Sequence, residues 1–295
     1  MDREGPIRSD EKGGVRLTGY GTSHGAITVI NAMPCNIGAT IGTELRTDAE
    51  FDTKGNTKLV FIENDLKENT EMARICVSAA YAVMEIEEPD AWSLNISSEI
   101  PISRGLKSSS SACNAILGAV FDRYNYKVDG LVLVRLGVQC ARLAKVTVTG
   151  AFDDAWGCQH GGFVITDNEE DSVIFDDDIR DLDVLIHIPK KKIRKTGLPL
   201  AELRALAPQM KKIIELAKTD PLAAMTENGR LISTVQGVDN SIAEIALKHG
   251  ALGAGMSGSG PAIAIVLEKG DLVDFQNRSG IYGDIITQTR PRHCL

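Results

Sequence analysis

Four consecutive serines, Ser108 to Ser111, stand directly before an apolar-periodic stretch that begins at Ala112. A single serine is enough to cap a helix, so the run raises the question of what the other hydroxyl groups do. The start of a helix leaves backbone N–H groups without partners and carries about half a positive charge. Such a helix start, together with neighbouring hydroxyl groups, is typical of an anion-binding site, and phosphate is its usual ligand.

The loop before the serines carries further residue types that phosphate binding uses. Gly105 lets the backbone approach a ligand closely, Lys107 adds positive charge, and Pro101 constrains the exit from the preceding strand. The loop is not a Walker A motif, because Lys107 follows Leu106 and not a glycine. A polar linker capped by its last serine is the alternative, but the strand expected before the loop and the helix expected after it favour phosphate binding.

A pair of aspartates, Asp153 and Asp154, lies in the segment VTVTGAFDDAW. Such a pair is ordinarily part of a solvated turn. Here it follows an extended run and stands between Phe152 and Trp156, which favours partial burial. We expect a strand or extended segment followed by a turn at this pair.

A glycine-rich stretch, GAGMSGSGPAIAIV, occupies residues 253–266. Its first six residues match G-x-G-x-x-G, which in a dinucleotide-binding fold lies between a strand and a helix. In this chain Pro261 and a β-branched strand follow the glycines, so an NAD site is the less favoured alternative.

The elements that must position these residues mix helices and strands without strict alternation. Apolar residues at helical spacing predict helices at 70–86, after the serines, and at 129–144, and two runs at 161–167 and 171–175 predict a hairpin. A new strand is expected at 181–189. Two helices follow, at 200–219 with an interruption at Pro208, and at 221–236 with a break at Gly229. The pattern indicates an α+β protein with two domains that meet near residue 180.

Composition narrows the function classes. With 43% apolar and 24% charged residues, the 295-residue chain is typical of a folded globular protein, and its net charge of −8 argues against a nucleic-acid partner. The six cysteines are scattered without a C-x-x-C pair, which favours a reducing cytoplasm. Apolar runs such as 262–267 are too short to span a bilayer, and the polar N-terminus has no signal-peptide pattern, so we expect no membrane partner.

Three motifs together carry a family resemblance. The loop PISRGLKSSSSA resembles the P-x-x-x-G-L-x-S-S motif of the GHMP kinases, the stretch 253–266 resembles their third, glycine-rich motif, and Asp153 matches their aspartate motif. Within that superfamily, segments such as SHGAITVINAMPCNIGATIG, VTVTGAFDDAWG, AAMTENG and TQTRP resemble the archaeal-type shikimate kinases, and the likeness covers nearly the whole chain from Val15.

The resemblance implies a two-domain GHMP kinase fold. After a polar tail (1–14), it implies a ribosomal-protein-S5-like N-terminal domain at 15–180, which contains the phosphate loop, and a ferredoxin-like C-terminal domain at 181–295. The activity that it implies is ATP-dependent phosphorylation of shikimate to shikimate 3-phosphate, with ATP and Mg²⁺ as cofactors.

It also implies roles for particular residues. Asp153 is the expected catalytic residue, with Asp154 beside it, and Ser109 and Asp153 are the expected metal contacts. The residues expected to bind ATP and its phosphates lie in the two glycine-containing loops: Pro101, Ser103, Arg104, Gly105, Leu106, Lys107, Ser108, Ser109, Ser110, Ser111, Gly255, Ser257, Gly258, Ser259 and Gly260.

Two departures from the family pattern concern charge. Gln139 stands where a glutamate is expected on the helix before the aspartate motif, and Ile37 stands where a lysine is expected. Arg104, Lys107 or Arg142 could supply the missing positive charge, and shikimate, which carries a carboxylate, should face at least one Arg or Lys. The basic run KKKIRK at 190–195 is either a solvated face or a border of the substrate cleft.

Two alternatives within the family remain open at this point. One is another small-molecule GHMP kinase, such as a homoserine or mevalonate kinase. The other is a nucleotide-binding regulator that has lost catalysis. Gln139 and Ile37 offer slight support for it, while the intact serine loop and Asp153 argue against it.

Overall fold

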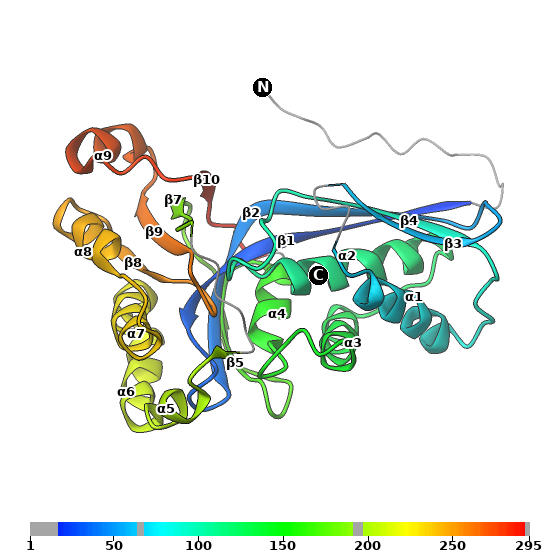
Figure 1. The fold of residues 1–295 in the computed structure, drawn as a ribbon, viewed down its shortest axis with the longest axis horizontal. Helices are drawn as coiled ribbons and strands as arrows, with labels where there is room; N and C mark the ends of the chain where they lie inside the picture. The colour runs from blue at the N-terminus through cyan, green and yellow to red at the C-terminus, as the bar shows by residue number, and fades with distance from the viewer. Residues whose placement is uncertain (1–16, 64–67, 191–196, 293–295) are drawn as a thin grey trace.

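The computed structural model describes residues 17–63, 68–190 and 197–292. The predicted tail (1–14) and residues 191–195 of the basic run lie outside this part of the chain. The described strands form a six-stranded and a four-stranded sheet (Figure 1). The first contains β1 (Thr18–Ile30), β2 (Ile37–Asp52), β3 (Lys58–Ile62), β4 (Trp92–Ser98), β5 (Phe163–Asp167) and β6 (Ser172–Asp177). The second contains β7 (Leu182–His187), β8 (Gly253–Met256), β9 (Ile263–Glu268) and β10 (Ile285–Gln288).

Strand β2 organises the first sheet. It pairs antiparallel with β1 along most of its length, with β5 through its first residues (Ile37–Ile41) and with β4 through its last (Thr47–Asp52). Strand β3 runs parallel to β4 at one edge, and β6 forms the predicted hairpin with β5 at the other.

Helices cover one face of this sheet (Figure 1). They are α1 (Glu71–Met84), α2 (Ser108–Arg123), α3 (Gly130–Leu143) and α4 (Phe152–His160). The predicted helices at 70–86 and 129–144 are confirmed. Helix α2 lies directly against β1, because a Cβ atom at Gly19 or Gly21 would overlap the α2 backbone. These glycines therefore set the depth at which the serine run is held.

The second sheet has the order β10-β7-β9-β8 with every pair antiparallel. It is accompanied by α5 (Leu200–Arg204), α6 (Ala207–Ala217), α7 (Pro221–Gln236), α8 (Ser241–Lys248) and α9 (Leu272–Ser279). Among the described residues, none of the helices combines the length and hydropathy that spanning a bilayer requires.

The largest apolar cluster joins the two sheets. It includes Ile27 and Ile41 from the first sheet, Val184 and Val266 from the second, and Met210 from α6. The chain passes from one sheet to the other between Asp177 and Leu182. The α+β class agrees with this arrangement, while the division at residues 180 and 181 stays a prediction.

Three local predictions need correction or completion. The serines do not precede the helix but form its first turn, because Lys107 adopts a left-handed conformation (φ 69°) and takes the N-cap position. The predicted break at Gly229 is wrong, since α7 runs unbroken to Gln236. Gly229 instead allows β8 to approach, because a Cβ atom there would lie 2.7 Å from Cα of Gly255. The interruption at Pro208 is confirmed, since this residue lies in the first turn of α6.

The aspartate pair also lies in a different element from the one predicted. Asp153 and Asp154 occupy the first turn of α4, which begins after Ala151 in a left-handed conformation (φ 56°). Carboxylates are favourable in the first turn of a helix because of its partial positive charge. The predicted turn at the pair is therefore wrong, because both residues are helical. Residues 146–150, for which the sequence predicts a strand or extended run, have no strand assignment.

Candidate active site

A cavity of about 700 Å³ brings the predicted loops together with the aspartate pair. The predicted site residues that line it are Ser103, Gly105, Lys107, Ser108, Ser109, Ser110, Asp153, Asp154, Gly258 and Ser259. Further lining comes from the end of β1 and the turn after it (Thr28–Met33) and from the segment 146–151 before α4. The cavity therefore contains residues that are more than 200 positions apart in the chain.

The start of α2 forms one wall. The first turn of the helix closes with the hydrogen bond from Ser111 N to Lys107 O (3.0 Å). The backbone N–H groups of Ser108, Ser109 and Ser110 consequently have no acceptor within the helix, and all three residues line the cavity. Three such donors at the positive end of a 16-residue helix make a binding site for an anionic group.

The two glycine-containing loops brace each other. The hydroxyl of Ser257 donates to Gly105 O (2.9 Å) and accepts from Thr28 N (3.2 Å), and Gly258 N donates to the Thr28 hydroxyl (2.7 Å). Gly105 has φ 84°, and a Cβ atom there would overlap the carbonyl oxygen of Ser257. The close approach of the loops thus requires glycine at this position.

Changing Gly105 to alanine is expected to raise KM for ATP at least tenfold, because the added methyl group must separate the two loops. Gly197 is the matched control, since a Cβ atom there would meet nothing within 4 Å and its φ is unexceptional. Steady-state kinetics of both variants check this. Equal KM values for ATP in the Gly105→Ala, Gly197→Ala and parent proteins would contradict it.

Lys107 is buried next to the two loops, where it contacts Asp154 and Thr28. Its side chain is 4% exposed, and its Nζ lies 2.7 Å from Oδ1 of Asp154 and donates to the Thr28 hydroxyl at 2.6 Å. Burial alone would lower the pKa of Lys107, but the charges of Asp154 and Asp153 outweigh burial and raise it above its ordinary value. The ammonium group is therefore charged at neutral pH and faces the cavity from below the helix start.

Asp153 is almost fully buried, with 3% of its surface exposed. Its carboxylate packs against Gly38 of β2, where a Cβ atom would overlap it. Burial and the neighbouring charge of Asp154 raise the pKa of Asp153 to about 7, although Lys107 and a hydrogen bond from Asn168 act in the opposite direction. A carboxyl group with this pKa can accept a proton near neutral pH.

Several residues that are predicted to bind ATP do not line the cavity. Arg104 donates a hydrogen bond to Pro189 O at 3.0 Å, and Leu106 is buried in the apolar core. The others are half-buried Pro101, buried Ser111, Ser257 and Gly260, and Gly255 within β8. For these residues direct binding of ATP stays a prediction.

Gln139 and Ile37, the two residues that depart from the family pattern, do not line the cavity. Gln139 is exposed on α3, and Ile37 packs against the main core. Arg142, a candidate for the missing charge, is bound to Asp171 (2.6 Å) and to Asn168 O (2.9 Å). Of the three candidate cations, Lys107 is the one that lines the cavity within the described residues.

Sequence reasoning missed two residues of this site, Thr28 and Asn168. Thr28 joins both loops and Lys107, and Asn168 holds Asp153. Thr28 could have been noticed as a polar residue within an apolar strand, GAITVI, because buried polar side chains need partners. Asn168 follows a strand in a polar segment that looks like an ordinary turn, so nothing in its local sequence points to the site.

The NAD alternative is not supported. The glycines of GAGMSG belong to strand β8 and the turn after it, and strand β9 follows. A dinucleotide-binding loop would lead into a helix whose N-terminus holds the pyrophosphate.

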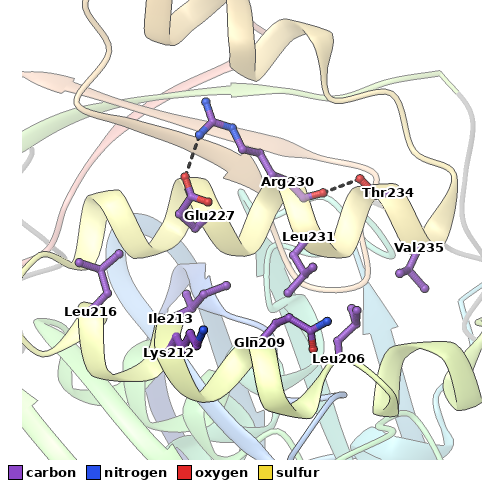
Figure 2. Close-up of a pocket in the computed structure, with 10 residues that line it drawn as sticks. All are labelled: Leu206, Gln209, Lys212, Ile213, Leu216, Glu227, Arg230, Leu231, Thr234 and Val235. Carbon is purple, nitrogen blue, oxygen red and sulfur yellow. Dashed lines mark hydrogen bonds and ion pairs between the residues drawn. The ribbon is translucent and has the colours of Figure 1, made fainter.

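A second groove, of about 660 Å³, lies between α6 and α7 (Figure 2). Apolar side chains such as Leu216 and Leu231 dominate it. Its charged residues are Lys212, Glu227 and Arg230, of which Arg230 pairs with Glu227 at 2.7 Å. None of the predicted site residues lines this groove, so the cavity at the start of α2 is the candidate active site.

Comparison with known proteins identifies relatives of the whole chain. Residues 73–162 match the family model of the GHMP kinases N terminal domain, and residues 215–278 match that of the GHMP kinases C terminal. Shikimate kinase of Pyrococcus abyssi is 34% identical over 277 residues, which cover 92% of this chain and 98% of that protein. Shikimate kinase of Methanothrix thermoacetophila is 35% identical, over 85% of this chain and 86% of that protein.

Solved structures agree on the fold. Mevalonate kinase of Methanococcus jannaschii superimposes with a TM-score of 0.76 over 96% of this chain and 100% of that chain, at 16% sequence identity. At this identity the likeness concerns the fold alone.

Proposed function

The chain belongs to the GHMP kinase family, in the group of its shikimate kinases, and on this basis we propose that it transfers the γ-phosphoryl group of ATP to shikimate. The product is shikimate 3-phosphate, with ADP released. Curated relatives that match over most of both chains are shikimate kinases, which favours this acceptor over homoserine or mevalonate.

One observation carries the proposal: a buried carboxylate and a helix start with unpaired backbone N–H donors line the same cavity. In phosphoryl transfer a protein mainly positions the two substrates and neutralises the negative charge of the phosphates. The N–H groups of Ser108, Ser109 and Ser110 and the ammonium of Lys107 supply donors and positive charge for the triphosphate. Asp153 lines the same cavity, and its proposed role is to accept the proton of the acceptor alcohol.

The chemical step balances with the groups in the cavity. The acceptor hydroxyl oxygen forms a bond to the γ-phosphorus while the bond from that phosphorus to the β–γ bridging oxygen breaks, and ADP leaves. The hydroxyl proton passes to the carboxylate of Asp153. The raised pKa of Asp153 makes this carboxylate a better proton acceptor than an ordinary aspartate.

GHMP kinases use ATP together with Mg²⁺. The donors in the cavity fit this ion, because Mg²⁺ prefers oxygen ligands and is usually held by one or two carboxylates and the phosphates of the substrate. We propose the hydroxyl of Ser109 and the carboxylate of Asp153 as its protein contacts. Within the described residues, no group of three or more His, Cys, Asp or Glu could hold a metal unaided. The ion's contribution is to neutralise charge on the phosphate oxygens.

We further propose that the protein acts in the cytoplasm on small molecules, without nucleic-acid or membrane partners. The net charge of −8 and the scattered cysteines support this proposal.

The test is ADP release measured with shikimate, homoserine and mevalonate as acceptors. We expect turnover with shikimate at least 100 times faster than with the other two. Faster turnover with homoserine or mevalonate would replace the substrate assignment. ATP binding without ADP release on any of the three acceptors would indicate a regulator instead.

The activity should depend on pH through Asp153. Because its pKa is raised to about 7 in the folded protein, the carboxyl group is protonated below that pH and cannot accept the hydroxyl proton. We therefore expect kcat/KM for ATP, which reports the protein before ATP and Mg²⁺ bind, to fall about tenfold per pH unit below an apparent pKa near 7. Initial rates between pH 5.5 and 9 measure it, and a flat profile from pH 5.5 to 7.5 would contradict it.

A further inference from the structure

Asn168 is fully buried directly after strand β5 and does not line the cavity, yet it contacts the expected catalytic carboxylate. Its Nδ2 donates to Oδ1 of Asp153 at 2.7 Å, and its Oδ1 accepts from the backbone N–H of the same Asp153 at 3.1 Å. One amide side chain thus holds both the side chain and the main chain of one residue.

The orientation of this amide follows from the donors around it. A backbone N–H can only donate, so the group that faces the N–H of Asp153 must be the oxygen of Asn168. The hydroxyl of Thr166 donates to the same oxygen at 2.7 Å. The –NH₂ group must then face the carboxylate of Asp153, and its second hydrogen lies toward the hydroxyl of Thr149, at 3.4 Å. All four hydrogen-bonding positions of the amide are therefore engaged.

The main chain of Asn168 is anchored as well. Its N–H donates to Asn36 O at 2.9 Å, and its carbonyl accepts from Arg142 at 2.9 Å. Arg142 is held in turn by both carboxylate oxygens of Asp171, at 2.6 and 2.8 Å. The amide is thus attached to residues of three segments: the turn before β2, helix α3 and the connection between β5 and β6.

We propose that Asn168 is the positioning residue of the active site. It holds Oδ1 of Asp153 through its –NH₂ group and the backbone N–H of Asp153 through its oxygen, so that the carboxylate keeps one orientation toward the acceptor hydroxyl. The inference rests on the proposed phosphotransferase function, because it assigns Asn168 a part in that reaction. A side chain that is fixed by such contacts reacts faster than one that must find its rotamer, and loss of an outer partner of this kind typically costs about 10- to 100-fold in activity.

The first test compares Asn168→Asp and Asn168→Ala with a matched control. Asn114 is also buried, and its Nδ2 donates to Ala155 O of α4 at 2.9 Å, but it makes no contact with the Asp153 carboxylate. We expect kcat to fall about 10- to 100-fold in both Asn168 variants, with the Kd for ATP changed less than threefold. The Asn114→Ala variant should keep kcat within about threefold of the parent. Equal losses of kcat in the Asn168 and Asn114 variants would overturn the proposal.

The second test is a double-mutant cycle with Asp153→Asn. If Asn168 acts through Asp153, adding Asn168→Ala to Asp153→Asn should change the residual turnover less than twofold. A loss as large as in the parent background would show an independent, general structural effect and would overturn the proposal.

The third test does not need activity. In Asn168→Asp two carboxylates face each other, so the midpoint of urea unfolding should fall. The exchanged pair, Asp153→Asn with Asn168→Asp, again places an amide against a carboxylate and should return the midpoint to that of Asp153→Asn alone. Failure to return would overturn the contact, even if Asn168→Ala does not fold. If the parent protein phosphorylates no acceptor, the proposed function fails, while this cycle still decides the contact.

Discussion

Replacement of Asp153 by asparagine is expected to lower kcat by about 10²- to 10⁴-fold, the range that a positioned acid or base supplies. The amide keeps the size of the side chain and can still accept the hydrogen bond from Asn168, but it cannot take a proton. Because the start of α2 is untouched, the Kd for ATP measured without Mg²⁺ should change less than threefold. ADP release and calorimetric titration with ATP measure the two quantities.

The same variant should not be less stable than the parent at pH 8. The pKa of Asp153 is raised in the folded protein, so the folded state binds the proton more tightly than the unfolded chain. The free energy of unfolding therefore decreases as the pH rises from about 4 to about 7, and the neutral asparagine avoids this decrease. Thermal melts at pH 8 test it.

Asp274→Asn is the control for this prediction. Asp274 is exposed in the first turn of α9, so the control makes the same change in the first turn of another helix, away from the cavity. We expect parental turnover in the control. Asp153→Asn with more than a tenth of the parental kcat would refute the assigned role.

Replacement of Lys107 by methionine should affect activity and stability together. The ammonium group lies at the helix start that we propose binds the phosphates, and loss of one such electrostatic contact typically lowers kcat by about 10²- to 10³-fold. Methionine also leaves Asp154 without its partner. Removal of one member of a buried ion pair typically costs about 3 to 5 kcal/mol in the free energy of unfolding. Because Asp154 is partly exposed, we expect the free energy of unfolding to fall by about 3 kcal/mol, at the lower end of this range.

The two effects of Lys107→Met can be separated. The double variant with Asp154→Asn removes the unpaired charge, so urea unfolding should show most of the stability restored while turnover stays low. Lys218 provides the surface comparison, since it pairs with exposed Glu215 at the C-terminal end of α6. Lys218→Met should therefore cost less than about 1 kcal/mol. A Lys107→Met protein as stable as Lys218→Met would contradict the buried pair.

The correct predictions from sequence are those whose signal lies within one element. The apolar spacing of residues 70–86 and 129–144 determines helices α1 and α3, because a helix must bury one face whatever it packs against. The glycines before Pro261 lead into a strand and so separate this loop from a dinucleotide-binding loop. The serine run indicated a helix start, although the helix itself begins four residues earlier than its apolar pattern, at Ser108.

The incorrect predictions have a common cause. A carboxylate pair in a short polar segment fits a solvated turn or the first turn of a helix equally well, and only packing against β2 distinguished them. Gly229 looks like a helix breaker until strand β8 is placed against it.

The chain's own residues thus determined the serine-rich helix start and helices α1 and α3, while the role of Asp153 beside the serine loop was an expectation from the family resemblance. The pairing of Lys107 with Asp154, the connection of both loops through Thr28, and the contact of Asn168 with Asp153 were decided only by the tertiary structure. Each joins residues from separate elements, and in a low-dielectric interior such contacts shift the pKa values and the orientations on which a proton transfer depends. Local spacing carries no information about which elements will meet, because that depends on how the two sheets and their helices share one core.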